Sequence, residues 1–173
     1  MAQYLIKNGA VSLGANFSGV TTGTTVKTML QFKASATAVP RLVEWGFSFD
    51  APASVTTGKI ELVEADNPAT VTASVAADIT KYDAAALMGG DPTTNLIVVG
   101  TTSTGYTSSG EGTTPTVLRD LDGPKLITTT AGFVYEKQFP LGQQPLVQIS
   151  KLLRFRVTFT VAVNLICYFI VEV

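Results

Sequence analysis

The most apolar stretch of the chain, Leu152–Val173, predicts two β-strands from its pattern of hydrophobic and polar positions. In its first half, hydrophobic residues (Leu153, Phe155, Val157, Phe159) alternate with polar ones (Arg154, Arg156, Thr158, Thr160). Successive side chains of a strand point to opposite faces, so this half predicts one buried face and one solvated face. After a turn near residues 162–164, alternation continues through Leu165–Val173, but there both faces are apolar.

A strand with two apolar faces has two possible places, and the pattern does not choose between them. It lies in a core that is covered on both sides, or at an interface between chains. Cys167 falls on the better-buried face, which predicts a small packed hydrophobe. The same stretch does not predict a membrane-spanning helix, because Arg154 and Arg156 interrupt it and the remainder is too short and too polar.

Further alternation predicts strands along most of the chain. In residues 24–33 we expect Val26, Thr28, Leu30 and Phe32 on one face; in residues 41–50 we expect Val43, Trp45, Phe47 and Phe49 to face inward. Additional strands are predicted at Lys59–Val63, at Thr70–Val75, and where Phe133, Tyr135, Lys137 and Phe139 alternate. Residues 78–91 predict a loop excursion with about one helical turn.

About eight strands without a convincing helix predict an all-β protein. We expect residues 24–173 to form a single jelly-roll-like β-sandwich of antiparallel strands, since the length suits one domain. Residues 1–23 are rich in Gly, Ser, Thr and Asn, with only short apolar groups, and predict an extended N-terminal arm.

Charge and composition narrow the possible partners. The chain has 12 Lys plus Arg against 13 Asp plus Glu, so its formal net charge of −1 offers no field to attract nucleic acid or an acidic membrane, and neither is expected as a partner. Charged residues make up only 14%, against roughly 25% in ordinary soluble domains, so much of the surface should be covered. The single cysteine excludes an internal disulfide. No secretory signal is evident, which predicts synthesis and retention in a cytosol.

Candidate chemistry is sparse. The chain has no histidine and its acids are scattered, so we predict no catalytic residue, metal site or cofactor, and no enzymatic activity. Asp120 and Asp122 in "DLDG" resemble the opening of a calcium loop, but the later bidentate Glu is missing, and we expect a solvated turn. "GANFSGVT" (residues 14–21) has the glycine spacing of a phosphate-binding loop, but Val20 stands where a lysine is needed. "NFS" (residues 16–18) is read as a chance glycosylation match.

Four segments occur in a characteristic order: "VEWGFSFD", "GTTSTGYTSSGEGT", "VYEKQFPLGQQ" and the C-terminal stretch. With them, residues 42–173 resemble a family of small structural proteins of tailed phages of actinobacteria. Members look like head decoration, or cement, proteins with a jelly-roll or β-sandwich domain set over capsid subunits as trimers. The resemblance implies a virion protein at the capsid surface, made in the host cytoplasm, whose partners are the major capsid protein and itself as a homotrimer.

Under this resemblance, we expect contacts with the shell or the next protomer from Tyr4, Leu5, Ile6 and Phe17. The alternative is that these residues form a local flap over the protein's own core. Two other function classes stay open. One is another virion part, such as a tail or head-fibre module; the other is a carbohydrate-binding sandwich, with Tyr82, Tyr106 and Tyr168 as candidate exposed aromatics.

Overall fold

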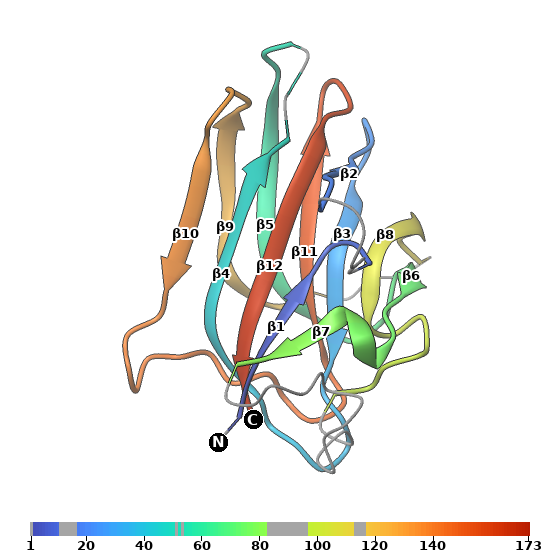
Figure 1. The fold of residues 1–173 in the computed structure, drawn as a ribbon, viewed down its shortest axis with the longest axis vertical. Helices are drawn as coiled ribbons and strands as arrows, with labels where there is room; N and C mark the ends of the chain where they lie inside the picture. Colours follow the sequence, from blue (N-terminus) through green and yellow to red (C-terminus); the bar gives the residue numbers. More distant parts are fainter. Residues whose placement is uncertain (1, 11–16, 51, 53, 83–96, 113–116) are drawn as a thin grey trace.

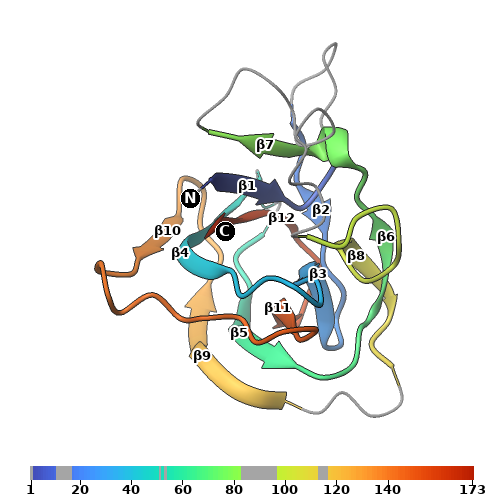
Figure 2. The same ribbon diagram turned by 90° about the horizontal axis from the view of Figure 1, so that it is seen from below.

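Two antiparallel β-sheets pack face to face in a sandwich, as Figures 1 and 2 show in two perpendicular views. The computed structural model describes residues 2–10, 17–50, 52, 54–82, 97–112 and 117–173. The described residues contain no α-helix; one 3-10 turn, η1, covers Ala76–Asp78. Within these ranges no helix is long and apolar enough to cross a membrane. The predicted all-β class and antiparallel sandwich are confirmed.

Sheet A, the first of the two, contains six strands. Its main path runs in the order β10 (Val134–Gln138), β4 (Arg41–Phe49), β12 (Asn164–Glu172), β1 (Gln3–Lys7) and β7 (Ile79–Lys81), and the short β2 (Val20–Thr21) pairs with the start of β12. Sheet B runs in the order β6 (Thr70–Ala73), β8 (Gly105–Gly110), β3 (Lys27–Lys33), β11 (Leu152–Phe159), β5 (Thr57–Ala65) and β9 (Val117–Thr128).

The chain passes repeatedly from one sheet to the other. It leaves β3 in sheet B for β4 in sheet A and returns as β5, and later β9, β10, β11 and β12 alternate between the sheets in the same way. As a result, three pairs of successive strands take corresponding places: β10-β4-β12 in sheet A matches β9-β5-β11 in sheet B. Next to them, β1 pairs with β12 as β3 pairs with β11.

Aromatic side chains from the two sheets meet in the core. Trp45 and Phe47 of β4 each contact Phe155 of β11, with ring centroids 5.6 and 5.7 Å apart, and Phe49 contacts Phe159 at 5.7 Å. These five side chains are all buried, as the alternation in residues 41–50 and 152–160 predicts. Burial of large aromatic surfaces is a dominant source of folding free energy, so this layer holds the sheets together.

The N-terminal segment differs from the expected arm. Gln3–Lys7 forms β1, which pairs with β12 on one side and β7 on the other, and Tyr4 and Ile6 are each only 1% exposed. The physical reason is a short alternation, Tyr4-Leu5-Ile6, that gives β1 one fully apolar inner face. Its backbone completes the edge that β12 would otherwise leave open.

One predicted strand face is wrong because of a β-bulge. Register between β3 and β11 shifts so that Phe155 lies opposite Leu30 and Arg156 opposite Thr28, which leaves Met29 as the extra residue. A bulge reverses the faces on either side of it. Met29 is therefore buried in the core, whereas Val26 is 49% exposed and Thr28 takes the side of Arg156.

The expected solvated turn at "DLDG" is also wrong. Residues 120–123 belong to β9, a strand with three register shifts that forms the edge of sheet B. Asp122 is mostly buried between the sheets: it accepts a hydrogen bond from Tyr135 Oη at 2.9 Å and pairs with Lys125 at 2.9 Å and Lys137 at 3.2 Å. Irregular edge strands tolerate Gly, Pro and charge, which hid β9 in the sequence.

Candidate interaction surfaces

The described residues hold no cluster of His, Cys, Asp and Glu side chains that could bind a metal ion. Cys167 is fully buried in the core, and this burial raises the pKa of its thiol well above the ordinary value. Its predicted role as a packed hydrophobe is confirmed.

The outer face of sheet A carries a row of partly exposed apolar residues. β12 turns Leu165, Cys167, Phe169 and Val171 into the core and presents Ile166, Tyr168 and Ile170, all half-buried, on the outer face. Leu5 of β1 lies beside Ile170 in register and continues the row. The doubly apolar strand of the sequence thus has one face in the core and one at a solvent-facing sheet surface.

Tyr168 lies flat across the neighbouring strand at Gly46. A Cβ atom at Gly46 would stand 2.7 Å from Cε1 of Tyr168 and 2.8 Å from the backbone oxygen of Tyr135, so only glycine fits there. The Tyr168 hydroxyl donates a 2.6 Å hydrogen bond to Oε1 of Glu44. Burial, and then the carboxylates of Glu44 and Glu136, raise the pKa of Tyr168 strongly, so it remains a neutral donor at physiological pH.

The four predicted contact residues do not stay together. Tyr4 and Ile6 belong to the core cluster, where they pack against the protein's own chain. Leu5 is half-buried on the outer face of sheet A. Phe17 is also half-buried, and the Lys7 ammonium lies 5.2 Å from the centroid of its ring. Only Leu5 and Phe17 are therefore placed where a partner could reach them.

The outer face of sheet B has a different form, because half of it is covered by the protein's own chain. Arg154 of β11 points away from the core, yet it is 0% exposed. Its guanidinium donates to Thr28 Oγ1 at 2.7 Å and pairs with Glu111, which follows β8. Glu111 also accepts from the backbone N–H of Thr28 at 2.5 Å and from Ser108. Burial lowers the pKa of Arg154, partly offset by the Glu111 carboxylate.

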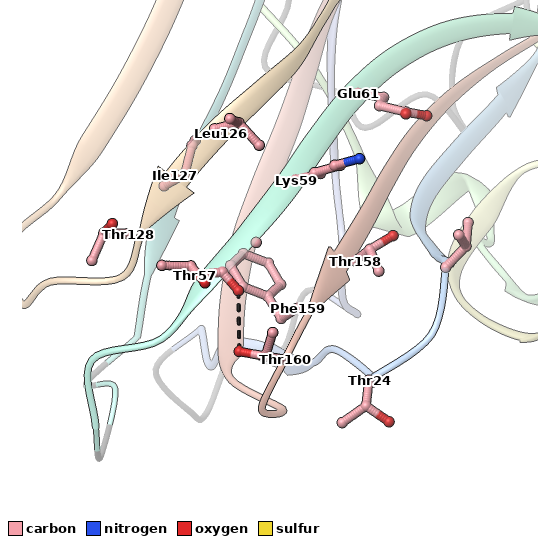
Figure 3. A pocket seen from close by; sticks show the side chains of 12 residues that line it. Thr24, Thr57, Lys59, Glu61, Leu126, Ile127, Thr128, Thr158, Phe159 and Thr160 are labelled. Atoms are coloured by element: carbon pink, nitrogen blue, oxygen red, sulfur yellow. Dashed lines mark hydrogen bonds between the residues drawn. The ribbon is translucent and has the colours of Figure 1, made fainter.

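The other half of this face is open and hollowed. Figure 3 shows the hollow, of about 730 Å³, with Lys59 and Glu61 from β5, Leu126 and Ile127 from β9, and Thr158 from β11 around it. Leu126 is 80% exposed. Lys59 is exposed and forms no ion pair with any described residue, while Glu61 pairs with Arg156. No aromatic side chain with an exposed ring lines it within the described part of the chain, since Phe159 is only 1% exposed.

The sequence indicated one of these surfaces and missed the other. The alternation of residues 165–173 predicted a strand with two apolar faces, but left open whether its second face lies in a core or at an interface. The hollow is lined by Leu126, which lies in the unpredicted strand β9, and by Val26, which the bulge turns outward. No local sequence pattern therefore predicts it. Residues 14–16, which include the start of the candidate phosphate loop and Asn16 of the glycosylation pattern, lie outside the described residues.

No protein-family model, no curated protein and no solved structure matches this chain.

Proposed function

We propose that this protein is a structural virion protein, a head decoration or cement protein of a tailed phage that binds the outer capsid surface and stabilises the shell, as a homotrimer. The support from sequence is the resemblance of residues 42–173 to that family. The support from the fold is a β-sandwich with two candidate interaction surfaces: the apolar row on the outer face of sheet A and the hollow on sheet B. In a trimer with cyclic symmetry, each of these surfaces would occur three times at one binding position on the capsid.

The strand order also supports the jelly-roll form of the sandwich that the resemblance implies. A jelly roll is a double sheet of eight strands built from two Greek keys. Eight strands of this chain, β10-β4-β12-β1 against β9-β5-β11-β3, take corresponding places in the two sheets, and the first three pairs are successive in sequence. Of the remaining short strands, β6, β7 and β8 extend the edges of this frame, and β2 pairs with the start of β12.

The observation that carries the proposal is the outer face of sheet A. Ile166, Ile170 and Leu5 form an apolar row on a regular sheet face, half-exposed in the single chain. Rows of this kind mark protein–protein contacts, because a fully solvated sheet face normally carries polar residues. A trimer contact through this row would remove it from water.

The test of the function uses empty shells assembled from the major capsid protein of a tailed actinobacteriophage. Purified chain is mixed with undecorated shells, the shells are pelleted, and the bound protein is measured together with the temperature at which the shells break. We expect saturable binding and a higher breaking temperature, because a ligand that binds only the intact state stabilises it. Shells saturated beforehand should take up none. Absence of binding would refute the proposal.

The homotrimer is tested separately by light scattering behind a sizing column. The expected mass is three times the 18.2 kDa of one chain. Replacement of Ile170 by Asp should convert the trimer to monomer while the strand remains folded. A wild-type protein that stays monomeric at high concentration would contradict the trimer, without bearing on whether it binds shells.

Carbohydrate binding is less well supported. A sugar ring commonly packs its apolar C–H face on an exposed aromatic ring. Tyr82, 52% exposed, is the open candidate, but it does not line the hollow. Tyr168 covers Gly46 and donates to Glu44, so its ring is already engaged by the protein.

A further inference from the structure

The segment that joins β10 to β11, residues 139–151, is an apolar loop with exposed side chains. It lies at the end of the sandwich where both termini emerge (Figure 1), and Figure 2 shows it running along the underside of the molecule. Residues 139–150, "FPLGQQPLVQIS", contain no charged side chain. Three large aliphatic side chains of this loop are open to solvent: Leu141 is 89% exposed, Ile149 50% and Leu146 45%.

The loop is held in a defined shape. Phe139 and Val147 turn inward and belong to the core cluster. Their backbone N–H groups donate to Val43 O at 2.9 Å and Pro40 O at 2.8 Å. The backbone N–H of Gln148 donates to the buried Glu64 carboxylate at 2.8 Å. The exposed aliphatic side chains are therefore fixed outward between buried anchors.

Leu141 stands at the tip of a tight turn. The N–H of Gln143 donates to Pro140 O at 2.9 Å, and Gly142 has φ +84°. This is the type II arrangement, in which the third residue needs positive φ and is therefore usually glycine. A rigid turn that presents a leucine loses little conformational entropy on binding, which favours a strong contact.

The charged residues around this loop have a small positive excess. Arg41 is exposed beside Leu146, with which it shares an isolated β-bridge, and Lys33 is half-buried opposite Leu152, next to the end of the loop; neither forms an ion pair with a described residue. Arg119 and Lys151 add cations that pair with Glu64 and Asp66. Glu172, opposite Arg41 in register, adds a third carboxylate. The surface is thus an apolar centre with a mixed charged border, in which the unpaired cations Arg41 and Lys33 face one unpaired carboxylate among the described residues.

We infer that the β10–β11 loop is the surface that seats on the shell, with Leu141 as its central anchor. The partner that fits it is a capsid-protein surface with an apolar hollow bordered by carboxylates. This inference rests on the proposed function, since it names the part of the molecule that performs it. Interfaces of this kind depend on a few central apolar anchors within a charged rim.

The test measures shell binding of two matched variants. Leu141→Ser should weaken binding to undecorated shells roughly tenfold or more, because a central anchor is lost. Leu126→Ser, an equally exposed leucine at the opposite end of the molecule, should bind as the wild type does. Circular dichroism and light scattering on both variants confirm that the fold and the oligomer are unchanged.

A second pair tests the charge of the border. Arg41→Glu should weaken shell binding several-fold, and raised salt should narrow the difference from wild type, because exposed charges are screened. Lys59→Glu, the same change in the hollow of sheet B, should leave shell binding unchanged.

The outcomes separate this inference from the function on which it rests. If the wild type binds shells and Leu141→Ser binds equally well, or Leu126→Ser is equally impaired, the loop is not the seat, although the function stands. If Leu141→Ser instead dissociates the trimer in solution, the loop is a contact between copies and the inference is overturned. If the wild type binds no shell, both fail.

Discussion

The outer faces of the two sheets are opposites, although the strands that form their centres, β11 and β12, follow each other directly in sequence. On β11 the outward residue Arg154 is fully buried, with partners for its guanidinium from Thr28 and Glu111. On β12 the outward residues Ile166 and Ile170 are half-exposed. The polar row is covered at Arg154, whereas the apolar row of β12 is partly open, and this reverses the usual distribution at these positions.

This reversal shows that alternation reports which residues share a face, and does not report whether that face is covered. Burial of the Arg154 row depends on Glu111 and Ser108, more than 40 residues earlier in the chain. A buried arginine is acceptable only when its charge is paired and its donors are satisfied. An open apolar row, in contrast, is stable in a single chain but favours association with a partner.

The largest expected effect comes from removing the buried cation. Arg154→Ala should lower the free energy of unfolding by about 3–5 kcal/mol, because it leaves the Glu111 carboxylate without its partner in a poorly solvated place. Arg156→Ala, two residues away and paired with the more exposed Glu61, should cost no more than about 1 kcal/mol. Urea denaturation of both variants measures the difference; equal losses would mean that the covered face is no different from an open one.

A second variant disturbs the open face by steric contact. Gly46→Ala should cost about 1–3 kcal/mol, since the new Cβ would meet both the Tyr168 ring and the backbone oxygen of Tyr135. Gly110→Ala, where nothing lies within 4 Å, is the matched control and should not destabilise the protein. Thermal unfolding measures both. If Gly46→Ala is as stable as the control, the flat placement of Tyr168 is wrong.

The dependence of stability on pH tests the contact between the edge strands β9 and β10, where Asp122 bonds to Tyr135 and Lys137. Burial alone would raise the pKa of Asp122, but hydrogen bonds from Lys125, Tyr135 and Lys137 bring it below its ordinary value. A carboxyl with a lowered folded-state pKa stabilises the fold above its unfolded pKa, near 4, and this stabilisation disappears as the pH falls through the folded value.

Asp122→Asn should therefore cost about 1 kcal/mol at pH 7, and the stability of the variant should fall less than that of wild type between about pH 5 and pH 2. Urea midpoints across this range provide the measurement. Parallel curves for the two proteins would show that Asp122 has an ordinary pKa and does not fasten the edge.

The smallest effect on stability is expected on the apolar row itself. Ile170→Thr keeps a β-branched residue on a half-exposed face, so the free energy of unfolding of the single chain should change by about 0.5 kcal/mol or less. The same substitution should weaken the trimer, seen as a lower mass on dilution. A large loss of chain stability with no change of mass would place Ile170 in the core.

Regular alternation allowed much of this fold to be predicted. Trp45, Phe47, Phe49, Phe155 and Phe159 were assigned to the core from their period of two, and the all-β sandwich follows from them. Bulges and edges were not predictable in this way. One extra residue, Met29, reverses the faces of β3, and β9 contains Gly123 and Pro124, which indicate a turn unless the strand is known to lie at an edge.

The candidate surfaces were predictable only in part. The apolar row of β12 was visible in the sequence because both of its faces are apolar. Arg154 was assigned to a solvated face, since nothing local signals that Glu111 lies over it. Leu5 stays a predicted contact residue on the outer face of sheet A, whereas its neighbours Tyr4 and Ile6 are core residues, because β1 continues sheet A instead of extending away from it.

The pairing of β1 with β12 also has a consequence for how the protein folds. Gln3 lies opposite Glu172, so the first strand pairs with the last. During synthesis β1 leaves the ribosome long before its main partner, and sheet A cannot be completed until the end of β12 has emerged. Contacts of such high sequence separation slow folding, often to milliseconds or seconds. We therefore expect the pairing of β1 with β12 to be a slow, late step of folding, during which the apolar edge of β12 is transiently open to pairing with other chains.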